Sequence, residues 1–133
     1  MQRHPALRQL SSDHHTGLVL ARKARQAANG TVHDQRYAWT TLVARFCAEL
    51  EPHFQVEEQG LLVALWRAGE AGLVERTLTE HEDMRGLIAQ DRPENLARFA
   101  ELLTAHIRFE EQTLFARAQE LLAPDQLSEL AMA

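Results

Sequence analysis

The sequence predicts an all-α protein, built as an up-down-up-down four-helix bundle. Three observations support this fold class. Leu, Ala, Glu, Arg and Gln, which are good helix formers, dominate the 133 residues. Only six glycines and four prolines interrupt them, and these divide the chain into segments of helix length. At roughly 150 residues per domain, the length predicts one domain that spans residues 1–133.

Two helical segments are expected in the first half of the chain. The first covers about residues 12–29, with an N-cap among residues 11–13 and Gly30 just past its end. The second covers about residues 34–68. It is expected to be interrupted or kinked at Pro52, because proline has no N–H to donate to the preceding turn.

The second half of the chain has the same organisation. A third helix is expected over about residues 70–90, and a fourth over about residues 93–122 with Pro93 in its first turn. A short tail from Pro124 is expected to add one or two helical turns. Four helices with short connections in a small chain predict antiparallel neighbours around one core.

Composition and charge argue against several classes of protein. Apolar residues make up 45% and charged residues 25%, as in an ordinary globular domain. The longest apolar run, residues 60–66, is too short for a membrane-spanning helix of about 20 residues. The first ten residues lack the apolar segment of a signal peptide, and a single cysteine suits a reducing cytoplasm. The net charge of −5 argues against nucleic acid and anionic membranes as partners.

A ten-residue pattern occurs twice, in the second and the fourth expected helices. Residues 53–62 (HFQVEEQGLL) and 106–115 (HIRFEEQTLF) both read His-apolar-x-apolar-Glu-Glu-Gln-x-Leu-apolar. Single His-x-x-x-Glu pairs arise easily by chance, but the extended match does not. Duplication of a plain helix hairpin, with no ligand role, is the simplest alternative.

Each copy of this pattern places a histidine and a glutamate on one helix face, because residues i and i+4 lie one turn apart. His53 pairs with Glu57, and His106 pairs with Glu110. Apolar residues flank both pairs, so all four side chains are expected in the core. The third helix adds His81. Its apolar stripe comprises Val74, Leu78, Met84 and Ile88.

Buried carboxylates are costly unless they are partnered. A single buried histidine is usually a satisfied core residue, but several histidines and two glutamates in one core need a shared partner. One or two metal ions provide it most simply. Imidazole and carboxylate ligands suit iron, manganese or zinc, and a carboxylate can span two cations. The competing interpretation is a mutual network of charged His and Glu.

The first helix is expected to supply the last ligand, either His14 or His15. At 100° per residue, His14 falls on the apolar face of this helix. His15 falls at the edge of that face, so periodicity favours His14. His4 and His33 lie in end or loop segments and are expected on the surface.

These motifs resemble those of the hemerythrin family, in particular the bacterial HHE-type hemerythrin-like domains. The resemblance covers about residues 10–115. It depends on four motifs in the same order at helix-long separations. They are SDHHTGL at 12–18, HFQVEE at 53–58, the single His81, and HIRFEE at 106–111.

The resemblance implies a four-helix bundle that holds two non-haem irons. It implies that Glu57 and Glu110 bridge the irons and that each helix contributes a terminal histidine, so that His53, His81 and His106 are ligands. In the family the first ligand is often followed three residues later by Leu or Ile, which points to His15 rather than His14. Both histidines therefore remain candidates.

One position departs from the pattern of hemerythrins proper, which carry a second histidine four residues after the first in the third helix. Arg85 occupies that position, and arginine has no lone pair to give a metal. The ligand set is thus one short, and water, Glu82 or Glu111 is expected to complete it. Glu58 and Glu111 each follow a bridging glutamate and are expected to contact the ligands or a neighbouring helix.

The expected function is that of a non-haem di-iron protein that binds or senses oxygen, or another small oxidant, in the bundle core. Its partner would be dioxygen, another diatomic molecule or a peroxide. A first alternative is a di-iron enzyme that acts on peroxide or nitric oxide, or an iron-handling protein. The missing ligand favours it, since an open position lets a substrate reach iron. A second alternative is a structural bundle with zinc or no metal. No catalytic residue and no oligomeric state is predicted.

The remaining unusual side chains have plain interpretations. Cys47 is expected to be a small buried apolar residue. Trp39 and Trp66 are expected to pack in the core or at helix ends. Tyr37 is a candidate for a pocket hydroxyl group.

Overall fold

The computed structural model describes residues 3–130, and within that range the secondary structure is helical, with no β-strand. The predicted all-α class is confirmed. In the first half of the chain a long helix is followed by a continuous helical stretch in which α-helix alternates with two π-helical turns. These elements are α1 (Pro5–Ala27), α2 (Val32–Arg45), η1 (Phe46–Leu50), α3 (Glu51–Val56), η2 (Glu57–Leu61) and α4 (Leu62–Arg67).

The second half has one uninterrupted helix, one helix with a π-helical turn and a short terminal helix. Its elements are α5 (Ala71–Gln90), the 3-10 turn η3 (Pro93–Asn95), α6 (Leu96–Phe109), the π-helical turn η4 (Glu110–Leu114), α7 (Phe115–Leu121) and α8 (Pro124–Leu130). The short helix confirms the expected turns after Pro124.

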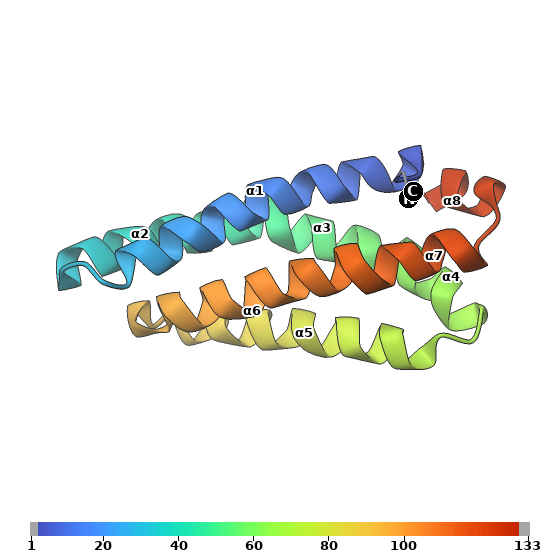
Figure 1. Cartoon of the computed structure of the whole chain (residues 1–133). Coiled ribbons are helices and arrows are strands. Elements are labelled where there is room, and N and C mark those ends of the chain that lie inside the picture. The colour runs from blue at the N-terminus through green and yellow to red at the C-terminus, as the bar shows by residue number, and fades with distance from the viewer. Residues whose placement is uncertain (1–2, 131–133) are drawn as a thin grey trace.

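The long helices lie side by side along their lengths (Figure 1). α1 packs mainly against α6 and also contacts α2, while α5 packs against α6 and α4. α8 folds back against α1 and η2. A Cβ atom on Gly17 would approach the Cδ1 atom of Ile107 to 2.9 Å, so the absence of a side chain allows the close contact between α1 and α6.

The start of the first helix and the position of the disturbance near Pro52 differ from the prediction. α1 begins at Pro5 rather than near residue 12, because proline suits the first helical turn and the side chain of His4 accepts a hydrogen bond from the amide of Ala6. The predicted disturbance near Pro52 lies just before it. In η1 the amide of Glu51 donates to the carbonyl of Phe46, five residues back, and helix continues through the proline.

The core consists of two apolar clusters. One joins α1, α2, α5 and α6 around Phe46, Phe54 and Phe99. The other lies toward α4, α7 and α8 and is built around Leu65, Leu114 and Phe115. The buried polar residues occupy the helix segments between these clusters. On α5 Thr77 is buried, and its hydroxyl donates to the carbonyl of Leu73, whereas the neighbouring Leu78, predicted for the core, is partly exposed.

One other expectation needs correction. Cys47 is exposed on η1 and is not a buried apolar residue. Trp66 is largely exposed at the C-terminal end of α4, and the largely exposed Tyr37 lines a shallow pocket between α1 and α2. Trp39 is buried as expected, and its indole N–H donates to the carboxylate of Asp91 at 2.9 Å. Within residues 3–130 no helix combines the length and the apolar character that crossing a bilayer requires.

Candidate metal centre

Six buried side chains meet in the middle of the molecule, and they are called the inner cluster here. Each is at most 5% exposed. They come from four helical segments that are far apart in the sequence. The members are His14 on α1, His53 on α3, Glu57 on η2, His81 on α5, His106 on α6 and Glu110 on η4.

The histidines form two pairs. The α1–α3 pair consists of His14 and His53, whose ring centroids lie 5.0 Å apart. The α5–α6 pair consists of His81 and His106, whose centroids lie 4.9 Å apart. Each pair, together with both glutamates, brings its ligand atoms within 4.8 Å of one another, and both groups are suited to hold a metal ion.

Each glutamate directs one oxygen to each histidine pair. Glu57 Oε2 lies 3.4 Å from His53 Nε2, and Glu57 Oε1 lies 3.2 Å from His81 Nε2. Glu110 Oε1 lies 2.7 Å from His14 Nε2, and Glu110 Oε2 lies 3.2 Å from His106 Nε2. The two carboxylates thus stand between the pairs with their oxygens divided, as carboxylates that bridge two cations must be.

Local backbone geometry is the same at both glutamates. A π-helical turn begins at Glu57, where the amide of Leu62 bonds to the glutamate carbonyl, and another begins at Glu110, where the amide of Phe115 does the same. π-turns inside α-helices are often found at functional sites. The repeated ten-residue pattern therefore encodes a repeated backbone feature as well as a repeated pair of side chains.

Outer carboxylates hold the other nitrogen of every imidazole. His14 Nδ1 lies 2.7 Å from Glu111, and His53 Nδ1 lies 2.9 Å from Asp13. His81 Nδ1 lies 2.7 Å from Glu58, and His106 Nδ1 lies 2.7 Å from Glu80. Because a carboxylate accepts a hydrogen bond from Nδ1–H, each Nε2 presents its lone pair to the inner cluster when the ring is neutral. This arrangement is typical of metal-binding histidines.

Nearby carboxylates stabilise the protonated form of the inner histidines despite their burial. Burial lowers the pKa of His53, but Glu110 and Glu57 outweigh it and raise that pKa to about 11. Burial also lowers the pKa of His106, yet Glu110 and Glu80 raise it to about 9. The pKa of His14 is raised too, since hydrogen bonds to Glu110 and Glu111 exceed the effect of burial.

The carboxylates show the opposite shift. Burial raises the pKa of Glu110, but the charge of His106 and hydrogen bonds from the surrounding imidazoles bring it well below its ordinary value. The same balance lowers the pKa values of the outer Glu58, Glu80 and Glu111. The chain therefore holds the inner cluster together by ion pairing when no cation is bound.

Aromatic rings line the inner cluster and exclude water from it. The ring of Phe54 stacks on His81 at 3.9 Å between centroids, and that of Phe115 stacks on His14 at 5.3 Å. Both phenylalanines are fully buried. In such surroundings an unpaired polar atom is expensive.

Several inner atoms nevertheless lack a hydrogen-bond partner among the described residues. They are both carboxylate oxygens of Glu57, one oxygen of Glu110, and the Nε2 atoms of His53, His81 and His106. These are nitrogen and oxygen donors aimed at a common centre. A pair of divalent cations would satisfy them all, so the donor set fits the metal that the sequence predicts.

The structure brings together every histidine and glutamate of the predicted site except His15. That side chain is exposed on α1, whereas His14 is buried in the inner cluster, in the position that helical periodicity favours. Neither candidate for completing the ligand set among the carboxylates enters the inner cluster. Glu82 is largely exposed and pairs with Arg85, and Glu111 binds His14 from outside.

Arg85 is turned away from the inner cluster. Its guanidinium group donates to Glu51, Glu58 and Glu82 at 2.7 to 3.3 Å. Glu58 contacts His81 and Glu111 contacts His14, so each touches a histidine of the predicted site as expected. The sequence does not predict the roles of Asp13 and Glu80, although each directly precedes a histidine of the inner cluster. Asp13 binds a histidine on another helix, as Glu80 does, and no helical periodicity reveals such a contact.

Comparison with known proteins agrees with this geometry. The protein-family model described as the hemerythrin HHE cation-binding domain matches residues 5–118. That match covers most of the chain, so the chain belongs to this family. Neither the curated proteins nor the solved structures include a match.

Proposed function

We propose that this hemerythrin-like cation-binding protein is a non-haem di-iron protein that binds or senses dioxygen, or another small oxidant, in its core. The observation that carries the proposal is the division of the Glu57 and Glu110 oxygens between two histidine pairs. A single cation would use only one half of that arrangement. The proposed ligands are His14, His53, Glu57, His81, His106 and Glu110.

The proposal includes the architecture that holds the site. The chain is taken as one domain over residues 1–133, in which four long helical segments run up, down, up and down. Antiparallel neighbours with side chains projecting inward are the usual setting for di-metal carboxylate sites in helical bundles. We also place the protein in the cytoplasm, where a single cysteine stays reduced.

The residues of the chain have separate tasks in this proposal. The four imidazoles and two carboxylates hold two irons, which when bound supply redox chemistry toward small oxidants. The outer carboxylates fix the imidazole rings by accepting hydrogen bonds from Nδ1–H. Phe54 and Phe115 exclude water. With Arg85 in place of a fifth histidine, the four imidazoles and two carboxylates would be the whole protein donor set, which would leave room for a small molecule.

That room also supports a second candidate function, an enzyme that acts on peroxide or nitric oxide. The observation in its favour is that Arg85 donates to three carboxylates and does not compete for the inner cluster. Steady turnover of hydrogen peroxide by the iron-loaded protein would favour the enzyme. Reversible spectral change on adding and removing oxygen would favour the binder or sensor.

The decisive experiment is elemental analysis of protein purified from iron-supplemented cells, with the near-UV and visible spectrum recorded on the same sample. We expect about two irons per chain and charge-transfer bands, because two groups of four donors are present. One zinc ion, or no metal and no colour, would overturn the proposal. The inner cluster would then be a structural feature, stabilised by one cation or by ion pairing alone.

A further inference from the structure

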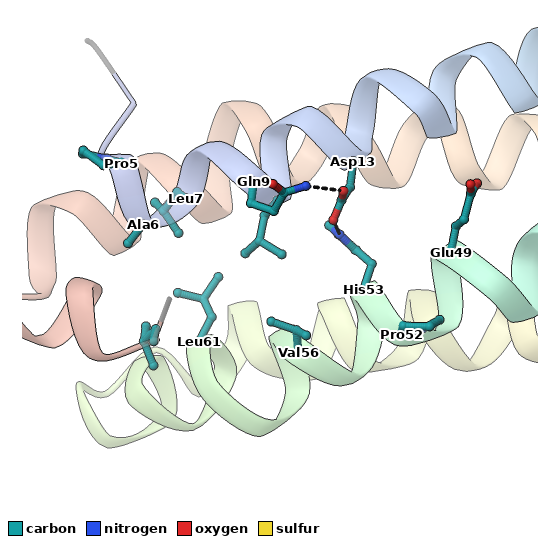
Figure 2. A pocket seen from close by; sticks show the side chains of 12 residues that line it. Pro5, Ala6, Leu7, Gln9, Asp13, Glu49, Pro52, His53, Val56 and Leu61 are labelled. Carbon is teal, nitrogen blue, oxygen red and sulfur yellow. Dashed lines mark hydrogen bonds and ion pairs between the residues drawn. The ribbon is translucent and has the colours of Figure 1, made fainter. Parts of the chain in front are cut away.

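A cavity of about 340 Å³ lies beside the inner cluster and does not belong to it. Figure 2 shows it between α1 and the stretch formed by α3 and η2, with α8 at one end. Its walls are mainly aliphatic. They comprise Leu7, Leu10, Pro52, Val56, Leu61 and Leu130. A cavity of this size falls in the lower range of small-molecule sites.

The polar side chains of the cavity gather at the end near His53. Asp13 and Glu49 approach this end from α1 and η1, and their side chains are 37% and 43% exposed. Asp13 accepts hydrogen bonds from Gln9 and His53, and Glu49 accepts one from Arg45. Both nitrogens of His53 already face carboxylates, Asp13 at Nδ1 and Glu57 at Nε2. The ionisable residues that line the cavity are thus two carboxylates and His53, with no lysine or arginine among them, and Arg45 reaches Glu49 from outside the cavity.

This division specifies the chemistry of a ligand. The aliphatic walls suit a hydrocarbon chain, since each buried methylene group stabilises binding. The carboxylates at the other end suit a cation and repel an anion, and the net charge of −5 acts in the same direction. At roughly 30 Å³ for each water-sized group, the volume accommodates about eleven such groups. An eight-carbon chain with an ammonium head is within that limit.

We propose that this cavity binds a small aliphatic ammonium compound. Its hydrocarbon chain lies among Leu10, Val56 and Leu61, and its ammonium group lies between Asp13 and Glu49. The inference rests on the shape and charge of the cavity and does not depend on the identity of the metal. A bound ligand would touch Asp13, the carboxylate that orients His53, and would therefore adjoin the α1–α3 pair.

Calorimetric titration with three eight-carbon probes tests this proposal. We expect octylammonium to bind saturably at one site, octanol more weakly, and octanoate weakest of all. Hexylammonium should bind more weakly than octylammonium by about fourfold for each methylene removed. Absence of saturable octylammonium binding, or octanoate binding as tightly as octylammonium, would overturn the proposal.

Two variants locate the site. Val56 is 44% exposed and lines the cavity, so Val56→Trp should fill it and weaken octylammonium binding at least tenfold. Val63 is 39% exposed but lies outside this cavity, so Val63→Trp is the matched control and should bind as the parent does. Equal binding by both variants would indicate adsorption of a cationic amphiphile to an acidic surface and would refute the site.

A third variant tests the charge. Glu49→Gln should reduce the preference for octylammonium over octanol, because the variant removes a negative charge that the uncharged octanol does not use. Glu49 lies outside the inner cluster, so the variant should keep its metal. An unchanged preference would contradict the assigned place of the ammonium group. Metal content is measured for every variant. Normal iron with no amine binding would refute this inference alone, whereas amine binding without iron would refute only the di-iron proposal.

Discussion

The two histidine pairs are equivalent in composition but differ in how firmly their surroundings hold them. In the α5–α6 pair both outer carboxylates are themselves bound by arginine. Arg85 donates to Glu58 at 2.9 Å, and Arg76 donates to Glu80 at 3.0 Å. Both histidines of this pair are essentially inaccessible to solvent.

The α1–α3 pair has weaker support. Asp13, the partner of His53, receives a hydrogen bond from the side-chain amide of Gln9. The carboxylate of Glu111, the partner of His14, receives one from Ser11. Arg3 lies 3.5 Å from this carboxylate and makes its shorter bond, 2.9 Å, to the Glu111 backbone carbonyl. The cavity described above also borders this pair. The comparison indicates that an ion held by the α1–α3 pair exchanges faster than one held by the α5–α6 pair.

The largest effect is expected from removing what the two pairs share. Glu110→Gln keeps the shape of the side chain but removes the charge that both pairs face, so metal content should fall from about two ions to well below one per chain. Elemental analysis measures it, with circular dichroism to verify folding. Glu111→Gln is the matched control on the outside of the site and should retain most metal. Two ions in the Glu110 variant would show that the pairs do not share this carboxylate.

Removal of one histidine should separate the pairs. His14→Ala is expected to lose the ion of the α1–α3 pair, leaving about one ion per chain, because the α5–α6 pair keeps its own donors. His15→Ala alters an exposed neighbour and should keep both ions. The reverse result, with loss in His15→Ala alone, would favour the spacing common in the hemerythrin family and would contradict the position of His14.

A moderate effect is expected from loosening the firmer pair. Arg85→Met leaves Glu58 without its cation, so the ion at the α5–α6 pair should bind about tenfold more weakly. Competition with a chromophoric chelator measures this loss. Arg45→Met removes an exposed arginine that pairs with Glu49 and should change nothing. Equal chelator curves for the two variants would mean that Arg85 does not act through Glu58.

The apparent metal affinity is expected to change gradually with pH. In the metal-free chain the raised pKa values of His53, about 11, and His106, about 9, keep both rings protonated near neutral pH. A metal must displace these protons. Apparent affinity should therefore fall about tenfold per pH unit for each displaced proton as pH decreases from about 8 to about 6. Metal uptake that releases no protons into a weakly buffered solution would contradict this.

The same pKa values determine how the metal-free protein responds to alkali and acid. A raised histidine pKa adds stability that is fully present below the unfolded value of 6.5 and is lost as pH rises through about 9 and then about 11. The lowered pKa of Glu110 adds stability above 4.5 that is lost in acid. The Tm of the metal-free chain should thus be highest between about pH 5 and about pH 7. A Tm that rises steadily toward alkaline pH would exclude this balance.

Much of the site could be predicted from the sequence because its signals are local. Helical periodicity alone places His53 beside Glu57 and His106 beside Glu110, and it favours His14 over its neighbour. The repeated His-apolar-x-apolar-Glu-Glu-Gln pattern indicates that these two His–Glu pairs belong to one site. Such patterns depend only on the spacing of residues within one helix, and that spacing can be read directly from the sequence.

Other features depended on contacts between helices, and only the tertiary structure decided them. Asp13 and Glu80 hold histidines on other helices, and their partners cannot be deduced from spacing within one segment. Cys47 is exposed although it directly follows the buried Phe46, because the neighbouring helices pack on the face of Phe46 and not on its own. Arg85 occupies a ligand position in sequence but turns toward three carboxylates in space. The sequence by itself determined the helices, the inner donors and their chemistry. Packing alone decided that one histidine pair is more firmly supported than the other, because outer partners and cavities arise where separate helices meet.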